Sequence, residues 1–344
     1  RPRNLVDSSA MPARIELCSG NKMTARGALA AGCTFFGGYP ITPSSEIYSE
    51  MMEHLPARGG VAVGTPDEIS AISYAVGASL GGARAMTATS GPGWSLMIET
   101  VQYAVMTETP VVIVVVQRLG PATGGATQGG QGDVLLVEHM TSGGYPIPVL
   151  APVDARDCYA LTAEAFRWAD ELRSPVVVLS DKEVGTTIES VDLAALGAVE
   201  IGPPAPVRAG EKWLPYGIDR IEDVPRFAPV GGPRKVTVTG SAHDDHGRLR
   251  KNDPETLRQL AHLDAKITAR ATSLERVRLS GAERPRTLVV SYGISARTCR
   301  EVVRGRDDVA LAEVLSLFTV PREALRAALG AGKGVERVVV VEEN

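Results

Sequence analysis

Gly37-Gly38-Tyr39-Pro40-Ile41-Thr42-Pro43-Ser44-Ser45-Glu46 is the stretch that decides the fold. It follows an apolar run over residues 31–36 and precedes a helical pattern carried by Ile47 and Met51, so it is a turn from a strand into a helix. In open α/β sheets such turns lie at the carboxyl ends of strands, where ligands bind. Thr42 followed by Pro43 also fits an N-cap and a first helical residue, so a simple capping role for Thr42 stays open.

Outward from this turn, apolar runs and helical patterns alternate from residue 23 to about 185. Continuous apolar strands that alternate with helices predict a parallel sheet covered on both faces. The pattern weakens from about 186 to 285, where it keeps only a charged surface helix over 254–270, and it resumes at Thr287. We therefore expect an α/β protein with two doubly wound parallel-sheet domains, at 15–190 and 286–344, joined by an irregular excursion at 191–285. Because the chain stops directly after a strand, the second sheet is expected to continue beyond Asn344.

Composition excludes several classes of function. A net charge of −4 gives no electrostatic case for nucleic acid or an anionic membrane surface. No apolar run approaches the roughly 20 residues that span a bilayer. Residues 1–10 lack a secretory signal pattern, so a cytoplasmic location is expected. No two cysteines have metal-site spacing, which predicts buried thiols and no iron–sulfur cluster in this chain; they are Cys18, Cys33, Cys158 and Cys299.

Two further turns place polar groups where ligands bind. Thr65-Pro66-Asp67-Glu68 fits a capping box, with Thr65 as N-cap, and the alternative is that Glu68 serves a ligand ring nitrogen. Ser90-Gly91-Pro92-Gly93 leads from a strand into a helix, where glycines allow close backbone approach and free N–H groups face a polar ligand. An ordinary tight turn remains the alternative. The helix over 94–106 is apolar around most of its circumference, which favours a subunit interface over a place in the core.

Arg118 ends an unbroken apolar run and requires an anionic partner if it is buried. That partner is either a structural carboxylate or the carboxylate of a substrate, which suits guanidinium geometry. The glycine-rich segment 122–133 is expected to be a lid or binding loop. His243-Asp244-Asp245-His246 is expected to be a solvated turn, not a metal site.

Together these motifs resemble the α subunit of the 2-oxoacid:ferredoxin oxidoreductases, which are thiamine-diphosphate enzymes that oxidise 2-oxoacids to acyl-CoA. The resemblance covers residues 20–185, 240–243 and 288–344. Gly120-Pro121-Ala122-Thr123-Gly124 is similar to the loop of the 2-oxoglutarate branch. The stretches that carry it are Gly38 to Ser45, Asp67-Glu68-Ile69, Thr87 to Gly93, Gln117-Arg118 and Ser180-Asp181.

The resemblance implies a pyrimidine-binding domain at 15–190 and a transketolase C-terminal-like domain at 286–344. Glu68 would hydrogen-bond the aminopyrimidine of thiamine diphosphate, while Thr42, Arg118 and Thr123 would bind the 2-oxoacid. Glu68, Arg118 and Thr42 are thus the implied catalytic residues. The cofactor-binding residues that it implies are Glu68, Tyr39, Pro40, Ile41, Ser90, Gly91, Pro92 and Gly93.

The same resemblance implies partners. A β subunit would supply the Mg²⁺-diphosphate site and a [4Fe-4S] cluster, a separate γ subunit is expected, CoA is the co-substrate, and ferredoxin or another acceptor takes the electrons. Dimerisation would be α–α or α–β. Two alternatives stay open: the same chemistry on a branched-chain or aromatic 2-oxoacid, and a non-catalytic scaffold subunit. Lys22 and Arg84 are the candidates for binding a second substrate carboxylate.

Overall fold

The computed structural model of the chain describes residues 14–202, 207, 210–331 and 334–343. Residues 1–10, on which the expected location rests, lie outside the described residues. The strands are β1 Ile15–Ser19, β2 Phe35–Gly38, β3 Val61–Gly64, β4 Ala85–Thr89, β5 Val111–Gln117, β6 Val149–Leu150, β7 Pro175–Asp181, β8 Ile188–Asp192, β9 Val277–Gly281, β10 Thr287–Ser291, β11 Val309–Val314, β12 Ser316–Phe318 and β13 Arg337–Val341. The α-helices are α1 Gly20–Ala30, α2 Ser45–His54, α3 Glu68–Leu80, α4 Gly91–Met106, α5 Val134–Glu138, α6 Ala155–Leu172, α7 Lys182–Thr186, α8 Pro254–Thr268, α9 Gly293–Val303 and α10 Arg322–Ala331.

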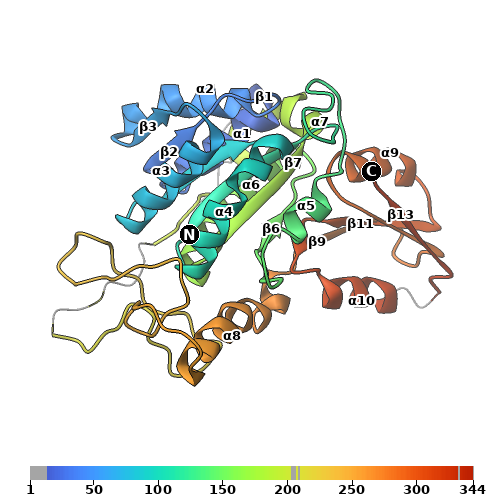
Figure 1. Ribbon diagram of the computed structural model, residues 1–344. Coiled ribbons are helices and arrows are strands. Elements are labelled where there is room, and N and C mark those ends of the chain that lie inside the picture. Colours follow the sequence, from blue (N-terminus) through green and yellow to red (C-terminus); the bar gives the residue numbers. More distant parts are fainter. Residues whose placement is uncertain (1–13, 203–206, 208–209, 332–333, 344) are drawn as a thin grey trace, which may run out of the picture.

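The main sheet has the strand order β12-β6-β7-β5-β4-β2-β3. All its neighbouring strands are parallel except β12, which runs antiparallel to β6. Helices α1, α2 and α6 cover one face, and α3 and α4 cover the other (Figure 1). Val112 and Val114 of β5 pack into the first layer, whereas Ile113 and Val115 pack into the second. Because β5 is buried on both faces, its sequence is an almost continuous apolar run.

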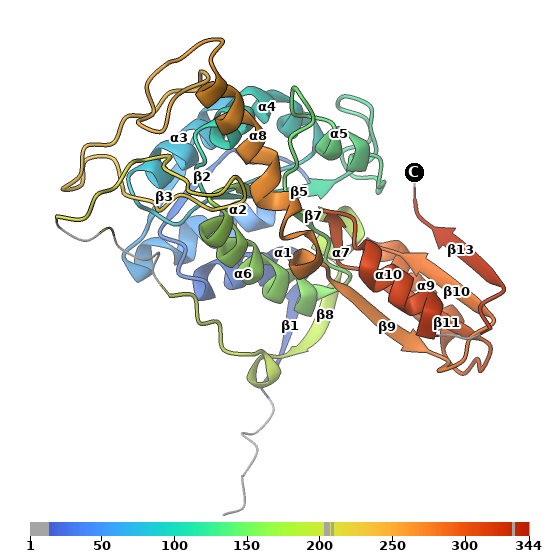
Figure 2. The same ribbon diagram turned by 90° about the horizontal axis from the view of Figure 1, so that it is seen from below.

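A smaller sheet with the order β13-β10-β11-β9 lies beside the main one (Figure 2). Helix α10 packs on one of its faces through Ala328, and α9 packs on the other through Cys299 and Val303. The predicted fold class, two doubly wound α/β units, is therefore confirmed. The structure adds antiparallel pairs that the sequence pattern did not indicate: β1 and β8 form a separate two-stranded sheet, β9 pairs with β11, and β12 pairs with β6 of the main sheet.

The excursion between the two sheets is irregular from 210 to 253 and then forms α8. Helix α8 is more than the expected surface helix, because its inner face buries His262, Leu263 and Lys266 against the main domain. The expected solvated turn at 243–246 is only partly observed, because His243 and Asp244 are buried whereas His246 is exposed. His243 is 2% exposed, and its ring stacks on Tyr216 at a centroid distance of 4.1 Å.

Two helices begin later than expected. Helix α2 begins at Ser45 with Ser44 as N-cap, so the capping role considered for Thr42 was wrong. Asp67, not Thr65, caps α3, because its carboxylate accepts a hydrogen bond from the Ser70 N–H at 2.7 Å. Glu68 is therefore the first residue of α3 and not the third residue of a capping box.

All four cysteines are free and buried, as predicted. Within the described part of the chain, no helix is long and apolar enough to cross a membrane.

Candidate active site

The predicted residues gather at one edge of the main sheet. Strands β2, β3, β4 and β5 are parallel, so the segments that follow them all leave the sheet at the same edge. Two of these ends are tied together, because the Thr65 hydroxyl donates to the Gly38 carbonyl at 3.0 Å. On the neighbouring helix, the Asn21 side-chain amide donates to the Pro43 carbonyl at 2.9 Å. The turn at 39–44 is thus fixed on both sides by polar contacts.

Glu68 lies at this edge and is only 6% exposed. Among the described residues, none donates a hydrogen bond to its carboxylate. A Cβ built on Gly93 would lie 2.6 Å from Glu68 Cγ and 2.1 Å from Thr89 Oγ1, so only glycine fits at this point. Gly93 therefore makes room for the Glu68 side chain, whose carboxylate has no hydrogen-bond partner in the part of the chain that the structure describes.

Arg118 is likewise 6% exposed and sits directly after β5. Its Nη1 donates to the Thr42 carbonyl at 2.6 Å, and its Nη2 donates to the Thr123 carbonyl at 3.1 Å. Its Nε is buried without a hydrogen-bond partner, and no carboxylate of the described residues forms an ion pair with it. The structure thus brings Arg118, Thr42 and Thr123 together, although through the backbone oxygens of the two threonines.

The glycine-rich loop folds back over Arg118 and lines a half-open cavity of about 410 Å³. Gly91 and Pro92 at the start of α4 line this cavity together with Arg118 and Asp133. Burial raises the pKa of Asp133 to about 6, although the backbone N–H and the charge of Arg118 both act to lower it. The cavity therefore combines a buried cation, an easily protonated acid and a helix N-terminus, which is a setting for an anionic ligand.

The end of this loop is held by polar contacts, which favours the binding-loop alternative of the sequence prediction over a lid. Gln131 is fully buried, and its side chain donates to Asp181 at 3.1 Å and accepts from Ser295 at 3.0 Å. Its backbone N–H donates to the Glu343 carbonyl at 2.7 Å. Gln131 thereby ties the loop to the end of β7, to α9 and to the segment after β13.

Some predicted residues lie apart from this cavity. Its lining does not include Tyr39, Pro40 or Ile41, and Tyr39 is 36% exposed. Glu68, Thr42, Thr123, Ser90 and Gly93 are also not among the lining residues, whereas Gly91, Pro92 and Arg118 are. Lys22 pairs with Glu16 at 3.3 Å. Arg84 pairs with Asp170 at 2.9 Å and precedes β4, at the opposite edge of the sheet. Neither is among the residues that line the cavity beside Arg118.

A larger cavity, of about 470 Å³, lies near the C-terminal end of α4, and none of the predicted site residues lines it. Its walls include Tyr103, Tyr145 and Ser241. We place the site in the smaller cavity because the unpartnered charged groups are found there.

Sequence reasoning missed four residues of the site: Asn21, Gln117, Gln131 and Asp133. Asn21 and Gln117 stand inside the motifs already noted, but no spacing rule separates a buried amide from a surface one. Gln131 and Asp133 close the glycine-rich segment, where composition suggested a mobile loop. The one available signal was that a polar pair directly precedes a short apolar run, Val134 to Val137.

Comparison with known proteins gives the family of this chain. Residues 26–261 match the family described as pyruvate flavodoxin/ferredoxin oxidoreductase, thiamine diphosphate-binding. The 2-oxoglutarate synthase subunit KorA of Archaeoglobus fulgidus is 41% identical, over 96% of this chain and 88% of the relative. The KorA subunit of Methanothermobacter thermautotrophicus is 39% identical, over 94% and 86%. The ketoisovalerate oxidoreductase subunit VorB of the same organism is 32% identical, over 92% and 84%.

Among solved structures, a 2-oxoglutarate:ferredoxin oxidoreductase from Magnetococcus marinus superposes with a TM-score of 0.86 at 29% identity. That structure has 2-oxoglutarate, coenzyme A and succinyl-CoA bound. The match covers 97% of this chain and 59% of that one. The predicted resemblance is thus confirmed, and the chain belongs to the pyruvate flavodoxin/ferredoxin oxidoreductase family, whose thiamine-diphosphate-binding domain it carries.

Proposed function

We propose that this chain is the α subunit of a thiamine-diphosphate-dependent oxidoreductase that converts 2-oxoglutarate and CoA to succinyl-CoA and CO₂. The observation that carries the proposal is the buried Arg118 guanidinium. Among the described residues it donates hydrogen bonds to two backbone carbonyl oxygens, those of Thr42 and Thr123. Carbonyl dipoles orient a guanidinium without neutralising it, and Asp133 acts on its charge without forming an ion pair with it. A buried charge without a direct ion pair is costly. A substrate carboxylate in the adjoining cavity would supply the missing anion with the planar geometry that arginine favours.

The contacts of Arg118 also revise how Thr42 and Thr123 would act. Both hold Arg118 through backbone oxygens, so they fix the direction of the guanidinium. The exposed Thr42 side chain is free to reach a substrate carboxylate as well. In this proposal Arg118 binds and orients the 2-oxoacid, and the two threonines position Arg118.

The residues present fit thiamine diphosphate. The Glu68 side chain is buried, and no described residue donates a hydrogen bond to its carboxylate. Gly93 leaves space beside it. Ser90 Oγ is also buried and has no hydrogen-bond partner among the described residues. Glu68 would hold the pyrimidine ring through a hydrogen bond to N1′, and the Ser90–Gly93 turn would contact the cofactor. When bound, the cofactor supplies the carbon nucleophile for the substrate carbonyl and accepts the electron pair that loss of CO₂ releases.

Partner subunits complete the proposed enzyme. Its relatives are named as subunits, which supports assembly with other chains. We assign the Mg²⁺-diphosphate site and the [4Fe-4S] cluster to a β subunit, with a separate γ subunit and ferredoxin as the acceptor. The division into a pyrimidine-binding domain at 15–190, an excursion at 191–285 and a transketolase C-terminal-like domain at 286–344 belongs to this proposal, as does the cytoplasmic location.

The choice of substrate rests on the comparison of relatives. Identity is 41% and 39% to two subunits named for 2-oxoglutarate and 32% to the one named for ketoisovalerate. The absence of a cation beside Arg118 for a second carboxylate, among the described residues, leaves a monocarboxylic 2-oxoacid as the second candidate. A second-carboxylate site on a partner subunit would reconcile the geometry with 2-oxoglutarate.

The proposal is tested by anaerobic viologen reduction with this chain co-purified with its native partners. CoA is added with 2-oxoglutarate, 2-oxoisovalerate, phenylglyoxylate or pyruvate in turn. CoA-dependent reduction that prefers 2-oxoglutarate is the expected result. Preference for a monocarboxylic 2-oxoacid would keep the chemistry and change the substrate. No reduction with any of the four, despite bound cofactor and intact clusters, would overturn the assignment.

Glu68→Gln separates a catalytic subunit from a scaffold. The amide cannot exchange a proton with the pyrimidine, so we expect turnover to fall at least a hundredfold. Glu53→Gln, an exposed position on α2, is the matched control and should leave turnover unchanged. If the Glu68 variant assembles and turns over like the wild type, the chain is a scaffold.

A further inference from the structure

Buried polar atoms without partners gather around the 410 Å³ cavity. Ser90 Oγ, Arg118 Nε and Asp133 Oδ2 are each shielded from solvent and lack a hydrogen-bond partner among the described residues. They lie at the carboxyl ends of β4 and β5 and just before α5. Because native proteins satisfy nearly all buried polar atoms, such a cluster indicates a polar ligand. Asp133 is the member whose charge opposes the anion proposed for this cavity.

The Asp133 carboxylate is built into the cavity wall. A Cβ on Gly91 would lie 2.5 Å from both of its oxygens, so glycine at the start of α4 is what lets the carboxylate reach this point. The Gln117 side-chain oxygen accepts from the Asp133 backbone N–H at 3.2 Å. Asp133 therefore stands between the N-terminus of α4 and Arg118, and both line the same cavity.

The charged groups around Asp133 determine whether its carboxyl is protonated. Burial raises the pKa of Asp133 to about 6, while Arg118 opposes the rise with its backbone N–H and its charge. The N-terminus of α4 at Gly91 also favours the charged form. Glu343 lines the same cavity, and Tyr292 from the segment before α9 lies within electrostatic range. An anion bound to Arg118 would cancel much of the arginine's effect and would itself repel a carboxylate, so protonation becomes easier.

We propose that Asp133 is a further substrate-binding residue, which is protonated in the occupied site and donates a hydrogen bond from Oδ2 to the substrate carboxylate held by Arg118. The proton comes from solvent on binding and returns to it on release. This inference rests on the proposed function, because it takes the anion in the cavity to be a 2-oxoacid.

A pH dependence follows from this role. Since kcat/KM reports the free enzyme, it falls tenfold per pH unit above about pH 6, where the fraction of protonated Asp133 falls in the same proportion. In Asp133→Asn the amide still donates a hydrogen bond but does not titrate, so the fall between pH 6.5 and 8 disappears. In Asp133→Ala the donor is lost, and kcat/KM at pH 6 drops by about tenfold to a hundredfold.

The experiment compares these variants in the co-purified complex by viologen reduction across pH 6 to 8. Asp170→Asn is the matched control, because burial also raises the pKa of Asp170, which however pairs with Arg84 at the opposite edge. That variant should keep the wild-type slope. A second measurement is calorimetry of glutarate binding to the cofactor-depleted complex in HEPES and in Tris, two buffers with different ionisation enthalpies, which gives the proton uptake on binding.

We expect uptake of close to one proton per site at pH 7.5 in the wild type and none in Asp133→Asn. If the pH dependence of kcat/KM is unchanged in Asp133→Asn, or if glutarate binds without proton uptake, the inference is wrong. The proposed function then still stands, provided that the wild type turns over a 2-oxoacid. Absence of wild-type turnover with every 2-oxoacid would instead count against the proposed function.

Discussion

Gly93 shows how one position constrains the site. Its missing Cβ leaves room for both Thr89 Oγ1 and the Glu68 side chain, at distances of 2.1 Å and 2.6 Å from where a Cβ would lie. In Gly93→Ala either the helix start or Glu68 has to move. We expect at least a tenfold loss of thiamine diphosphate affinity, measured by titrating cofactor into depleted complex.

Gly77 provides the control for this substitution. It lies inside α3, and a Cβ there meets no atom within 4 Å. Gly77→Ala should keep cofactor affinity and stabilise the chain by about 0.5–1 kcal/mol, because alanine lowers the entropy cost of forming a helix. Equal affinities of the two variants would show that the space beside Glu68 is not needed for the cofactor.

At single residues, sequence reasoning located the site better than it assigned the local contacts. Thr65 and Asp67 are both good N-caps, and spacing alone favoured Thr65 because Glu68 follows three residues later. The structure chooses Asp67, because the Thr65 hydroxyl is occupied by the Gly38 carbonyl of the neighbouring strand. That hydrogen bond joins residues 27 positions apart in the sequence, so a local sequence pattern cannot predict it. The sequence required an anionic partner for Arg118 if it is buried; the structure buries it, and no carboxylate of the described residues forms an ion pair with it.

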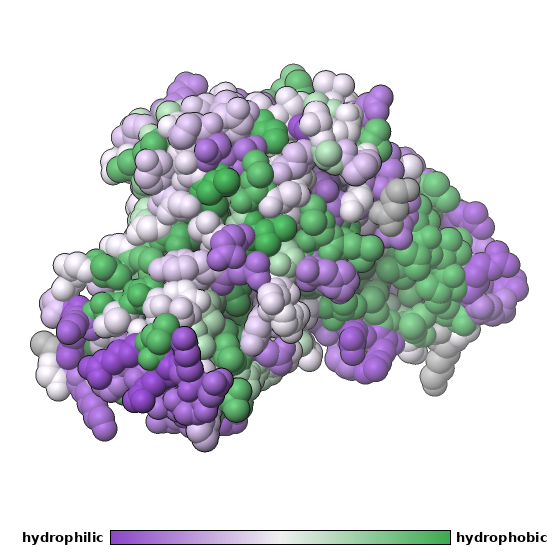
Figure 3. Space-filling view, in the orientation of Figure 1, coloured by the Kyte–Doolittle hydropathy of each residue, from purple (hydrophilic) through white to green (hydrophobic). Residues whose placement is uncertain are grey.

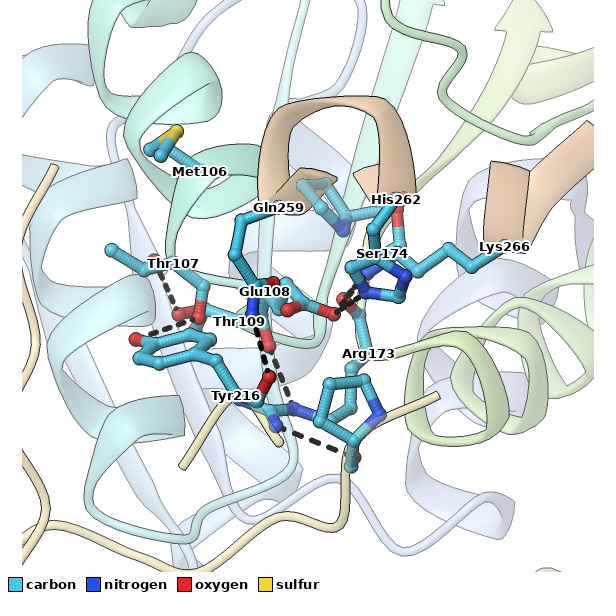
Figure 4. A network of polar contacts seen from close by, with 12 residues as sticks. Met106, Thr107, Glu108, Thr109, Arg173, Ser174, Tyr216, Gln259, His262 and Lys266 are labelled. Carbon is cyan, nitrogen blue, oxygen red and sulfur yellow. Dashed lines mark hydrogen bonds and ion pairs between the residues drawn. The ribbon is translucent and has the colours of Figure 1, made fainter. Parts of the chain in front are cut away.

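Among the elements, α8 illustrates what a local pattern cannot show. Its composition suggested a charged surface helix, yet Lys266 Nζ lies 2.7 Å from Glu108 Oε2 and His262 Nε2 lies 3.1 Å from the same oxygen (Figure 4). Arg173, whose guanidinium donates to the Glu108 carbonyl, completes the network. Strands β9 and β12 were missed for a related reason, because their antiparallel partners lie far away in the sequence. Parallel strands, buried on both faces, were found from their apolar runs alone.

The Glu108 network makes the attachment of α8 sensitive to pH. Burial would raise the pKa of the Glu108 carboxyl, but Lys266, His262 and Arg173 outweigh it and hold that pKa well below its ordinary value of 4.5. A carboxyl whose pKa is lower in the folded state stabilises the fold above the unfolded value, and this stabilisation is lost as the pH falls. We therefore expect the chain to lose stability as the pH falls below about 5, and Glu108→Gln to weaken that dependence.

Lys266→Met tests the same network at neutral pH. It leaves Glu108 with one cation fewer in a fully buried site, which should lower the free energy of unfolding by about 3–5 kcal/mol. Lys251→Met, at an exposed position just before α8, should change it by less than about 0.5 kcal/mol. Urea unfolding at pH 7 and pH 4 measures both effects. Equal midpoints for the two variants would mean that the network does not hold α8 in place.

For the whole molecule, the placement of apolar surface connects the site to assembly. Figure 3 shows hydrophobic side chains gathered over the small sheet, where Val338 and Val340 of β13 are 50% and 66% exposed. On the main domain, α4 packs Trp94, Met97 and Val101 into the core, so the expected interface does not involve its whole circumference. Its outer face, with that of α3, leaves apolar side chains exposed: Ile69 at 49%, Tyr74 at 54% and Leu96 at 52%. Apolar groups gathered in this way are typical of surfaces that another chain covers.

Leu96 is the position where this argument can be tested, because it lies one turn after Gly91 and Pro92, which line the cavity. If a β subunit completes the site, it covers this turn of α4, and a carboxylate at residue 96 would be buried without a partner. We expect Leu96→Asp to leave the chain folded but to reduce co-purification of the partner subunits at least tenfold. Leu257→Asp, on the exposed side of α8 and 65% exposed in the wild type, should assemble normally. Should Leu96→Asp recover a full set of partners, the two chains meet elsewhere, and the cavity beside Arg118 is closed by this chain alone.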